Sequence, residues 1–235
     1  ASPERAEHSL RFFKTGPGEY GEGDQFLGLT VPAQRKLARR YKMLPLSDVE
    51  KLLKSPYHEE RLTALFIMVL RFQDCTRQAE KARKNPAHPY TDERKAIYDL
   101  YFRLRNKVNN WDLVDSSAEH IMGPMHSEGN RSLLLKMVES RILWDRRIAL
   151  LATFHFIKRN DFATTLELCR RVLTDKEDLI HKAAGWMLRE IGERDESVML
   201  KFLDKYAATM PRTMLRYAIE KLPEKQRQTY LKRDF

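Results

Sequence analysis

Amphipathic helical patterns follow one another along almost the whole sequence, and this feature constrains the fold most. Apolar residues recur at helical spacing over roughly 58–72, 111–122, 130–139, 143–159, 162–173, 177–193, 196–209, 211–222 and 224–233. Three more helices are expected. One covers 31–42, one follows the cap and Pro at Ser2–Pro3, and one follows a capping box that begins at Ser47. A further helix is expected from a cap at Thr91 to about Arg105. Since no segment alternates convincingly like a strand, we predict an all-α fold.

Many of these helices form pairs, and the second members resemble one another. The segments concerned are ERLTAL (60–65), RRIAL (146–150), KAAGW (182–186) and LRYAI (215–219). Their small residues Ala64, Ala149, Ala184 and Ala218 are separated by 85, 35 and 34 residues. Helix pairs at such a period are typical of HEAT-like solenoids, where a small residue allows close helix approach. We therefore predict one HEAT-like α-solenoid domain over 1–235, with a Gly-rich loop at 16–25.

A basic residue recurs near the start of each second helix. Cations are unfavourable there, because the helix dipole is already positive at that end. The arrangement is understandable if helix starts and basic side chains converge on an anion such as phosphate. Alternatively, the long stems cover apolar surface while the charged heads stay in water. The residues are Arg61, Arg146, Arg147, Lys182, Arg212 and Arg216.

The charge balance also favours an anionic partner. The 43 Lys and Arg residues against 33 Asp and Glu give a formal charge of +10. Nucleic acid is the leading partner for such a chain, ahead of an acidic membrane surface or acidic protein. The absence of a long apolar run and of a secretory signal predicts a cytoplasmic location. Cys75 and Cys169 are expected to be buried hydrophobes in a reducing compartment.

Several other kinds of chemistry find little support. The seven histidines are scattered without metal-ligand spacing, so we expect no metal and no cofactor. The segment GPGEYGEG (16–23) lacks the dinucleotide-binding spacing, and fits a loop that contacts substrate or serves as a hinge. Basic pairs such as Arg35 with Arg39 are most simply a solvated helix face. The pairs Phe12–Phe13 and Tyr101–Phe102 are more typical of a core than of base stacking.

The segment NWDLVD (110–115) combines a large aromatic ring with a carboxylate. If it opens a helix, Trp111 and Asp115 lie one turn apart on one face. A carboxylate weakens the grip of a basic surface on polyanions, so this pair suggests a site that handles positive charge. The spacing alone also fits a Trp packed in the core with a solvated Asp115, and it favours that simpler interpretation.

Four segments together resemble the AlkD-type DNA alkylation repair family. They are FLGLTVP (26–32), WDLVD (111–115), LWDRR (143–147) and KAAGWMLRE (182–190), which occur in the expected order over most of the chain. The resemblance implies a HEAT-like solenoid whose concave basic face holds duplex DNA. It also implies a monofunctional glycosylase that removes N3- and N7-alkylated purines without drawing the base into a pocket.

The resemblance also implies roles for individual residues. Asp115 corresponds to the catalytic carboxylate, Trp111 and Trp186 to aromatics that pack against the lesion's deoxyribose, and Arg147 to a cation that binds the DNA backbone. Some members have a second Trp where this chain has Asn110, and the resemblance matches an N-terminal aromatic of the family to Phe12. The residues expected to bind DNA are Arg61, Arg146, Lys182, Arg189, Arg212, Arg216 and Phe12.

The sequence thus predicts a monomeric DNA glycosylase, associated with the nucleoid in the cytoplasm, whose partner is double-stranded DNA containing alkylated purines. It predicts no membrane partner. Two alternatives stay open. A non-catalytic binder of damaged or branched DNA would share the basic solenoid, and so would a solenoid scaffold for acidic proteins.

Overall fold

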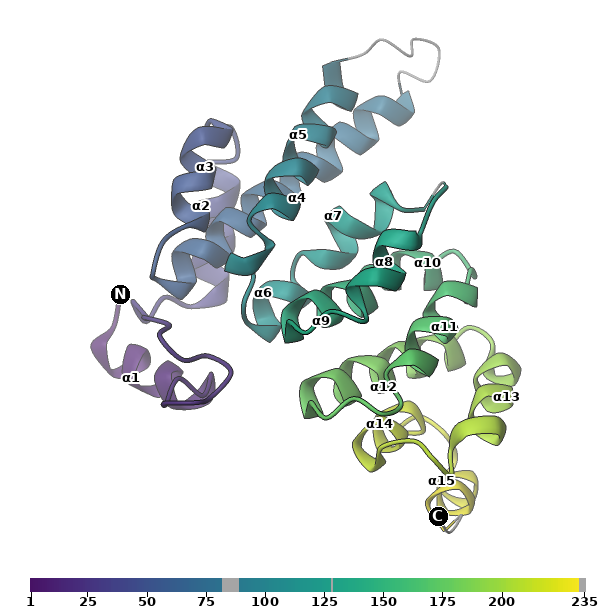
Figure 1. The fold of residues 1–235 in the computed structure, drawn as a ribbon. Coiled ribbons are helices and arrows are strands. Elements are labelled where there is room, and N and C mark those ends of the chain that lie inside the picture. Colours follow the sequence, from purple (N-terminus) through teal and green to yellow (C-terminus); the bar gives the residue numbers. More distant parts are fainter. Residues whose placement is uncertain (82–88, 128, 233–235) are drawn as a thin grey trace. The chain divides into compact units, whose positions relative to one another are not determined.

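The computed structural model describes residues 1–81, 89–127 and 129–232 (Figure 1). Helices make up 68% of the chain, and no strand is present among the described residues, which confirms the predicted all-α class. An isolated bridge pairs Gln25 with Tyr57. Across these described ranges, no helix is both long enough and apolar enough to cross a membrane.

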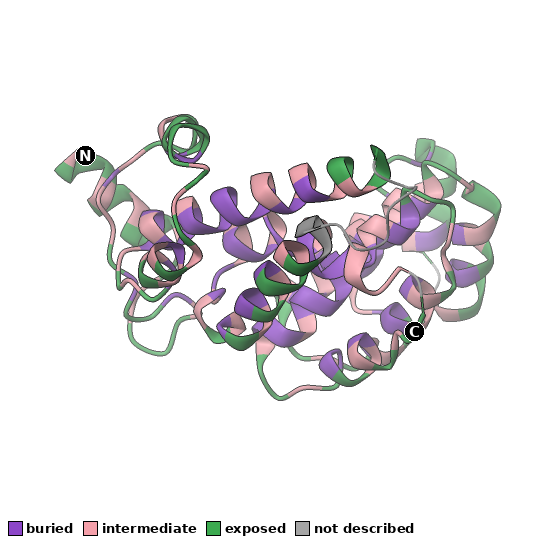
Figure 2. Cartoon of the chain, turned by 90° about the horizontal axis from the view of Figure 1, so that it is seen from above, coloured by how far each residue is buried: buried purple, intermediate pink, exposed green. Residues whose placement is uncertain are grey.

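The described chain divides into two compact units, residues 1–121 and 122–235. The first unit is built around the 24-residue helix α4, whose buried residues include Leu62, Leu65 and Phe72. Buried residues along the chain are purple in Figure 2. Helices α2, α3, α5 and α6 all pack against α4. The elements in and entering this unit are α1 (Pro3–Phe12), α2 (Val31–Arg40), α3 (Leu46–Leu53), α4 (His58–Lys81), α5 (Pro89–Arg103), η1 (Arg105–Lys107), α6 (Trp111–Asp115) and α7 (Ala118–Met125).

Helix starts in this unit follow local capping chemistry in part. Ser2 caps α1 as predicted, since its side chain accepts a hydrogen bond from the Arg5 backbone N–H. The capping box at Ser47 is wrong, because α3 begins at Leu46 behind Pro45, with no side-chain cap. The fixed φ of Pro45 suits a helix start without any such cap. Helix α5 begins at Pro89, before the predicted cap at Thr91, whose side chain lies outside the described residues.

The second unit is centred on α12, which packs against α9, α11, α13 and α14. Gly185 of α12 lies so close to α14 that a Cβ atom there would clash with the Met214 carbonyl oxygen. The segment predicted as one helix over 143–159 breaks at Thr153, whose hydroxyl bonds to the Leu150 carbonyl oxygen. The elements are α8 (Ser132–Met137), α9 (Leu143–Ala152), α10 (Phe154–Ile157), α11 (Ala163–Arg171), α12 (Asp178–Gly192), α13 (Glu196–Tyr206), α14 (Arg212–Ala218) and α15 (Glu224–Leu231).

The same turn precedes α4 and α9, and it explains part of the sequence repeat. The Ser55 hydroxyl accepts a hydrogen bond from the backbone N–H of Tyr57, two residues later. Arg61 then reaches back from the first turn of α4 to donate to the carbonyl oxygens of Ser55 and Pro56, both at 3.1 Å. An early basic residue in the second helix therefore closes the turn that leads into that helix.

Before α9, Ser140 accepts from the Ile142 N–H, and Arg146 donates to the Ser140 carbonyl oxygen at 2.9 Å. A third version precedes α12, where Asp175 accepts from the Glu177 N–H and its carbonyl oxygen lies 2.7 Å from His181 Nε2. The turns recur with the same 85- and 35-residue spacing as the small residues Ala64, Ala149 and Ala184. The repeat predicted from the sequence is thus present as repeated hydrogen bonds.

The Gly-rich loop folds on itself through its acidic residues. Glu19 accepts from the Gly16 N–H and Glu22 from the Gly18 N–H, both at 2.9 Å. These carboxylates therefore satisfy backbone donors within the loop. After the loop, the buried Glu59 of α4 accepts from three successive backbone N–H groups, those of residues 27–29. Gly28 has φ +73° and no room for a Cβ atom, because the Ser2 carbonyl oxygen lies against it.

Candidate functional site

Helix α6 is held in the protein by two buried apolar residues and carries partly exposed aromatic and acidic residues. Leu113 and Val114 are fully buried, whereas Trp111 and Asp115 are partly exposed. Asn110 is the N-cap, and its side-chain oxygen accepts from the Trp111 N–H at 2.8 Å. Asn110 is also completely buried, so its capping role is performed inside the protein.

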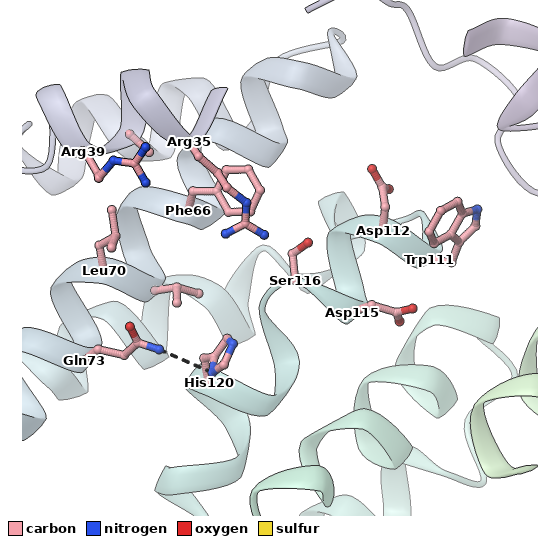
Figure 3. Close-up of a pocket in the computed structure, with 12 residues that line it drawn as sticks. Arg35, Arg39, Phe66, Leu70, Gln73, Trp111, Asp112, Asp115, Ser116 and His120 are labelled. Atoms are coloured by element: carbon pink, nitrogen blue, oxygen red, sulfur yellow. Dashed lines mark hydrogen bonds between the residues drawn. The ribbon is translucent and has the colours of Figure 1, made fainter. Parts of the chain in front are cut away.

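Trp111 and Asp115 line a cavity of about 330 Å³ within the first unit (Figure 3). This volume falls in the range of small-molecule sites. One wall comes from α2 and the floor from α4, while α6 and the start of α7 supply the opposite wall. The lining residues are Arg35, Ala38, Arg39, Phe66, Val69, Leu70, Gln73, Trp111, Asp112, Asp115, Ser116 and His120.

Charges of both signs face this cavity. The Arg35 guanidinium lies 4.2 Å from the centroid of the Phe66 ring, a cation–π contact that holds it on the α2 side (Figure 3). Asp112 and Asp115 project from α6 on the other side. The site therefore offers guanidinium groups suited to phosphate on one wall and carboxylates suited to a cation on the other. Sequence reasoning had treated Arg35 and Arg39 as an ordinary solvated face.

Asp115 also lies close to a buried phenol. Burial raises the pKa of Tyr101, and the negative charge of Asp115 raises it further. The Tyr101 hydroxyl lies 3.1 Å from the Ser117 hydroxyl, which in turn bonds to the Leu113 carbonyl oxygen at 2.6 Å. This chain of hydrogen bonds fixes the turn between α6 and α7 directly behind Asp115. Tyr101 is completely buried, which confirms its expected place in the core.

An aromatic cluster borders the same site. The Phe12 side chain is 55% exposed, so the expectation that it belongs to the core is wrong. Its ring lies 5.8 Å from the Trp111 ring in an edge-on contact, and Phe13 lies 5.5 Å from Trp111 in a stacked one. The structure therefore brings Phe12 next to Trp111 at the surface, where an exposed aromatic can contact a ligand.

Sequence reasoning missed a buried ionic network beside Trp111. His58, at the start of α4, is 1% exposed. Its Nδ1 lies 2.9 Å from Asp24 Oδ2, and its Nε2 lies 2.8 Å from Asp112 Oδ2. Burial alone would lower the pKa of His58, but hydrogen bonds to Asp112 and Asp24 raise it above its usual value. Burial would raise the pKa of Asp24, but the His58 bond and the Arg61 charge hold it low.

The geometry of Arg61 does not support its predicted role in binding DNA. Its side chain is almost fully buried, and Nη2 donates to Asp24 Oδ1 at 2.6 Å. Together with its bonds to the carbonyl oxygens before α4, this pairing occupies the guanidinium inside the protein. The recurrence that suggested a phosphate site at this position has a structural cause, namely closure of the turn.

In the second unit, Trp186 and Arg147 occupy neighbouring helices, α12 and α9. Trp186 is partly exposed, its Nε1 donates to Glu190 Oε1 at 3.0 Å, and its ring meets Phe154 edge-on at 5.9 Å. Arg147 is 5% exposed and donates to the carbonyl oxygen of Leu179 in the first turn of α12. That Trp186 and Arg147 share one site with Trp111 and Asp115 stays a prediction.

Four other predicted DNA-binding cations of this unit have partners within the chain. Arg146 pairs with Asp175 at 2.7 Å, and Lys182 with Asp178 at 2.7 Å. Arg189 pairs with Glu220, and Arg212 donates to the Leu231 carbonyl oxygen. Arg216 is exposed. Phosphate binding by the paired residues would have to compete with these contacts, and most strongly at Arg146, whose side chain is 12% exposed.

Other sequence expectations concern the cysteines and metals. Cys75 and Cys169 are both buried and free, which confirms their interpretation as small hydrophobes rather than a disulfide. Within the described part of the chain, no three His, Cys, Asp or Glu side chains are arranged to hold a metal ion.

Comparison with known proteins identifies the family. A family profile described as DNA alkylation repair enzyme matches residues 1–222. The chain therefore belongs to the DNA alkylation repair enzyme family, which indicates a role in DNA repair. A solved structure from Enterococcus faecalis, described as a predicted DNA alkylation repair enzyme, shares the fold, with a TM-score of 0.67 at 16% sequence identity. The match covers 95% of this chain and 97% of that one. No curated protein sequence matches significantly.

Proposed function

We propose that the protein is a monofunctional DNA glycosylase that hydrolyses the N-glycosidic bond of N3- and N7-alkylated purines in duplex DNA. The observation that carries this proposal is the cavity that Asp115 and Trp111 of α6 line together with Arg35 and Arg39 of α2. Family membership makes DNA the substrate, and the cavity pairs groups for phosphate with a carboxylate and an aromatic ring.

The chemistry of these lesions needs little acid catalysis. Alkylation at N3 or N7 makes the purine cationic, so that when the bond from C1′ to the base nitrogen breaks, the electron pair leaves with the base and neutralises it. Positive charge then develops on the deoxyribose as an oxocarbenium-like species. A water molecule completes the reaction by bonding to C1′ and losing a proton. The costly part is the transient sugar cation.

Asp115 and Trp111 are suited to stabilise that cation. A fixed carboxylate beside C1′ stabilises the positive charge that develops there and can orient the attacking water. The Trp111 ring offers its negative face and excludes bulk water, and Phe12 extends this aromatic border at the surface. In the proposed enzyme Trp186 supplies a second aromatic contact to the sugar, and Arg147 binds the DNA backbone.

Binding requires cations that are free to meet phosphates. Arg35 and Arg39 are exposed, one turn apart on α2, and both line the cavity with Asp115. We therefore assign them to the phosphates next to the lesion. Arg216, the exposed cation among those predicted from the sequence, is a candidate contact in the second unit.

The test is release of 7-methylguanine from methylated duplex DNA under single-turnover conditions. Asp115→Asn should slow release by roughly 10²–10³-fold, because one electrostatic group of the transition state is removed. DNA binding should be unchanged or slightly tighter, since the variant removes a negative charge. Asp99→Asn is the matched control, because Asp99 is an exposed carboxylate on α5 that pairs with Lys95.

Wild-type release at the rate of the protein-free reaction, together with tight binding to the same duplex, would instead favour the non-catalytic DNA binder. Binding to acidic proteins without salt-sensitive binding to plain duplex DNA would favour the scaffold. Release by Asp115→Asn at the wild-type rate would remove Asp115 from the reaction while leaving the glycosylase itself in place.

A further inference from the structure

His58 is placed between two carboxylates from different parts of the chain. Asp24 lies at the end of the Gly-rich loop, and its Oδ2 is 2.9 Å from His58 Nδ1. Asp112 belongs to α6, and its Oδ2 is 2.8 Å from His58 Nε2. Ionised carboxylates only accept hydrogen bonds, and a neutral imidazole has a single N–H. Both contacts are therefore hydrogen bonds at once only when His58 carries two protons.

The surrounding charges support that protonated form. Arg61 pairs with Asp24, so two carboxylates and two cations balance in the network of Asp24, His58, Arg61 and Asp112. Glu59, the neighbour of His58 on α4, directs its carboxylate to the backbone N–H groups of residues 27–29. From α1, the side chains of Arg5 and His8 line the adjoining cavity that His58 also borders.

Aromatic rings from both ends of the Gly-rich loop cover His58. The Phe13 ring lies 4.7 Å and the Phe26 ring 4.8 Å from the imidazole, measured between ring centroids. Phe13 also stacks on Trp111 at 5.5 Å. Residues 14–25 thus begin and end at side chains that rest on His58, so docking of the loop and burial of His58 occur together.

The other end of the network is attached to the proposed catalytic helix. Helix α6 has only five residues, too few to be stable by its own hydrogen bonds. Asp112 lies next to Trp111 and one turn of helix from Asp115. Misplacement of a reacting group by about 1 Å can cost 10²-fold in rate. The hydrogen bond from His58 to Asp112 is therefore well placed to hold Trp111 and Asp115 in position.

We propose that His58 is a positioning residue, which joins the Gly-rich loop through Asp24 to α6 through Asp112 and so holds Trp111 and Asp115 in the site. The inference rests on the proposed function, because it assigns His58 a part in the same reaction. In this proposal the Gly-rich loop also has a role, because Asp24 at its end helps to hold His58 and, through His58, the position of α6.

The first test is the pH profile of single-turnover release of 7-methylguanine. Wild-type release should fall on the alkaline side as His58 loses a proton and one of its two hydrogen bonds. His58→Gln should be about 10–100-fold slower, as for other groups that orient a reacting residue, and should lack this alkaline fall. His155→Gln, a histidine on α10 of the second unit, is the matched control and should keep the wild-type profile.

A second variant guards against simple loss of structure. Asp24→Asn leaves the cavity lining intact and can still accept a hydrogen bond, but it removes one negative charge from His58. The alkaline fall should then move to lower pH, a shift that a merely structural role would not produce. Wild-type rates and profiles in both His58→Gln and Asp24→Asn would overturn the inference and leave the glycosylase proposal intact.

If the wild-type protein releases no base at any pH, the proposed function fails and a second readout decides the fate of the network. Nitrogen NMR of the imidazole should show both His58 nitrogens protonated at pH 6, and Asp24→Asn should shift that titration to lower pH. A His58 that is neutral at pH 6 would overturn the network, whereas the expected titration would support it.

Discussion

Nε2 of His58 lies 2.8 Å from Oδ2 of Asp112, although 54 residues separate the two along the chain. This contact joins the start of the longest helix, α4, to the short α6 that carries Trp111 and Asp115. The same imidazole reaches Asp24 at the end of the Gly-rich loop. Three segments that are distant in sequence therefore meet at one titratable group, which makes the stability of the first unit depend on pH.

The first prediction concerns this dependence. The pKa of His58 is raised above its usual 6.5, so its stabilising contribution is complete below that pH and is lost as pH rises through the folded pKa. The pKa of Asp24 is lowered from its usual 3.8, so its contribution is complete above that pH and is lost as pH falls through the folded pKa. Stabilisation by the pair should therefore be greatest between these two usual values.

Urea unfolding of the wild type and of His58→Gln, measured across this pH range, checks the prediction. The difference in unfolding free energy should be largest near pH 5 and should shrink toward both acid and alkali. Asp24→Asn should lose the acid limb, since its amide does not titrate. A difference that is constant with pH would show that the His58 and Asp24 charges add nothing to stability.

The sequence predicts the fold well because helical periodicity is a local property. The helix pairs, the small residues that recur with them and the buried Tyr101 all follow from spacing along the chain. The breaks at Ser116–Ser117 and at Thr153 were not predicted, since hydroxyl bonds to nearby carbonyl oxygens interrupt apolar patterns that continue across them. The predicted cap at Ser47 gave way to Pro45, which acts through its ring and not through a side-chain hydrogen bond.

The candidate site was only partly predictable. The pair Trp111 and Asp115 has a visible spacing, and the structure places both residues on one cavity. His58 and Asp24 carry no such signal, because their contacts span 34 and 54 residues and depend on how the loop folds back. The basic residues at helix starts fitted either phosphate binding or a structural role within the protein. For Arg61 the internal hydrogen bonds decide in favour of a structural role.

The second prediction tests that role of Arg61. Arg61→Gln should lower the unfolding free energy by about 3–5 kcal/mol, because it removes one of the two cationic partners of the buried Asp24 carboxylate and upsets the charge balance of the network. Lys36→Gln, on the exposed face of α2, should change stability by less than about 0.5 kcal/mol. Thermal or urea unfolding measures both. A stable Arg61→Gln protein with weakened DNA binding would contradict this account and restore the contact with phosphate.

The third prediction concerns Arg35 and Arg39. Replacing both with Gln should weaken binding to duplex DNA of any sequence and reduce the slope of log K against log salt by about two, one for each phosphate contact. Stability should change little, since both side chains are exposed. Binding measured by fluorescence anisotropy over a salt series gives the slope directly.

The matched control for Arg35 and Arg39 replaces Lys201 and Lys205 of α13 with Gln. Lys201 and Lys205 have the same i, i+4 spacing, and replacing them makes the same change in net charge. They lie on α13, and neither residue lines the cavity. The control should keep the wild-type salt slope. Equal losses of slope in the two double variants would mean that binding follows net charge and not the site.

The last prediction separates two roles for Arg147. Its guanidinium donates to the Leu179 carbonyl oxygen and is 5% exposed, so Arg147→Ala should lower the unfolding free energy by about 1–3 kcal/mol through loss of that partner. If Arg147 also binds the DNA backbone, the salt slope should fall by about one as well. Arg147→Lys keeps the charge but not the planar fork, so it should recover most of the slope and less of the stability. An unchanged slope in Arg147→Ala, with stability reduced, would leave Arg147 as a structural link between α9 and the first turn of α12.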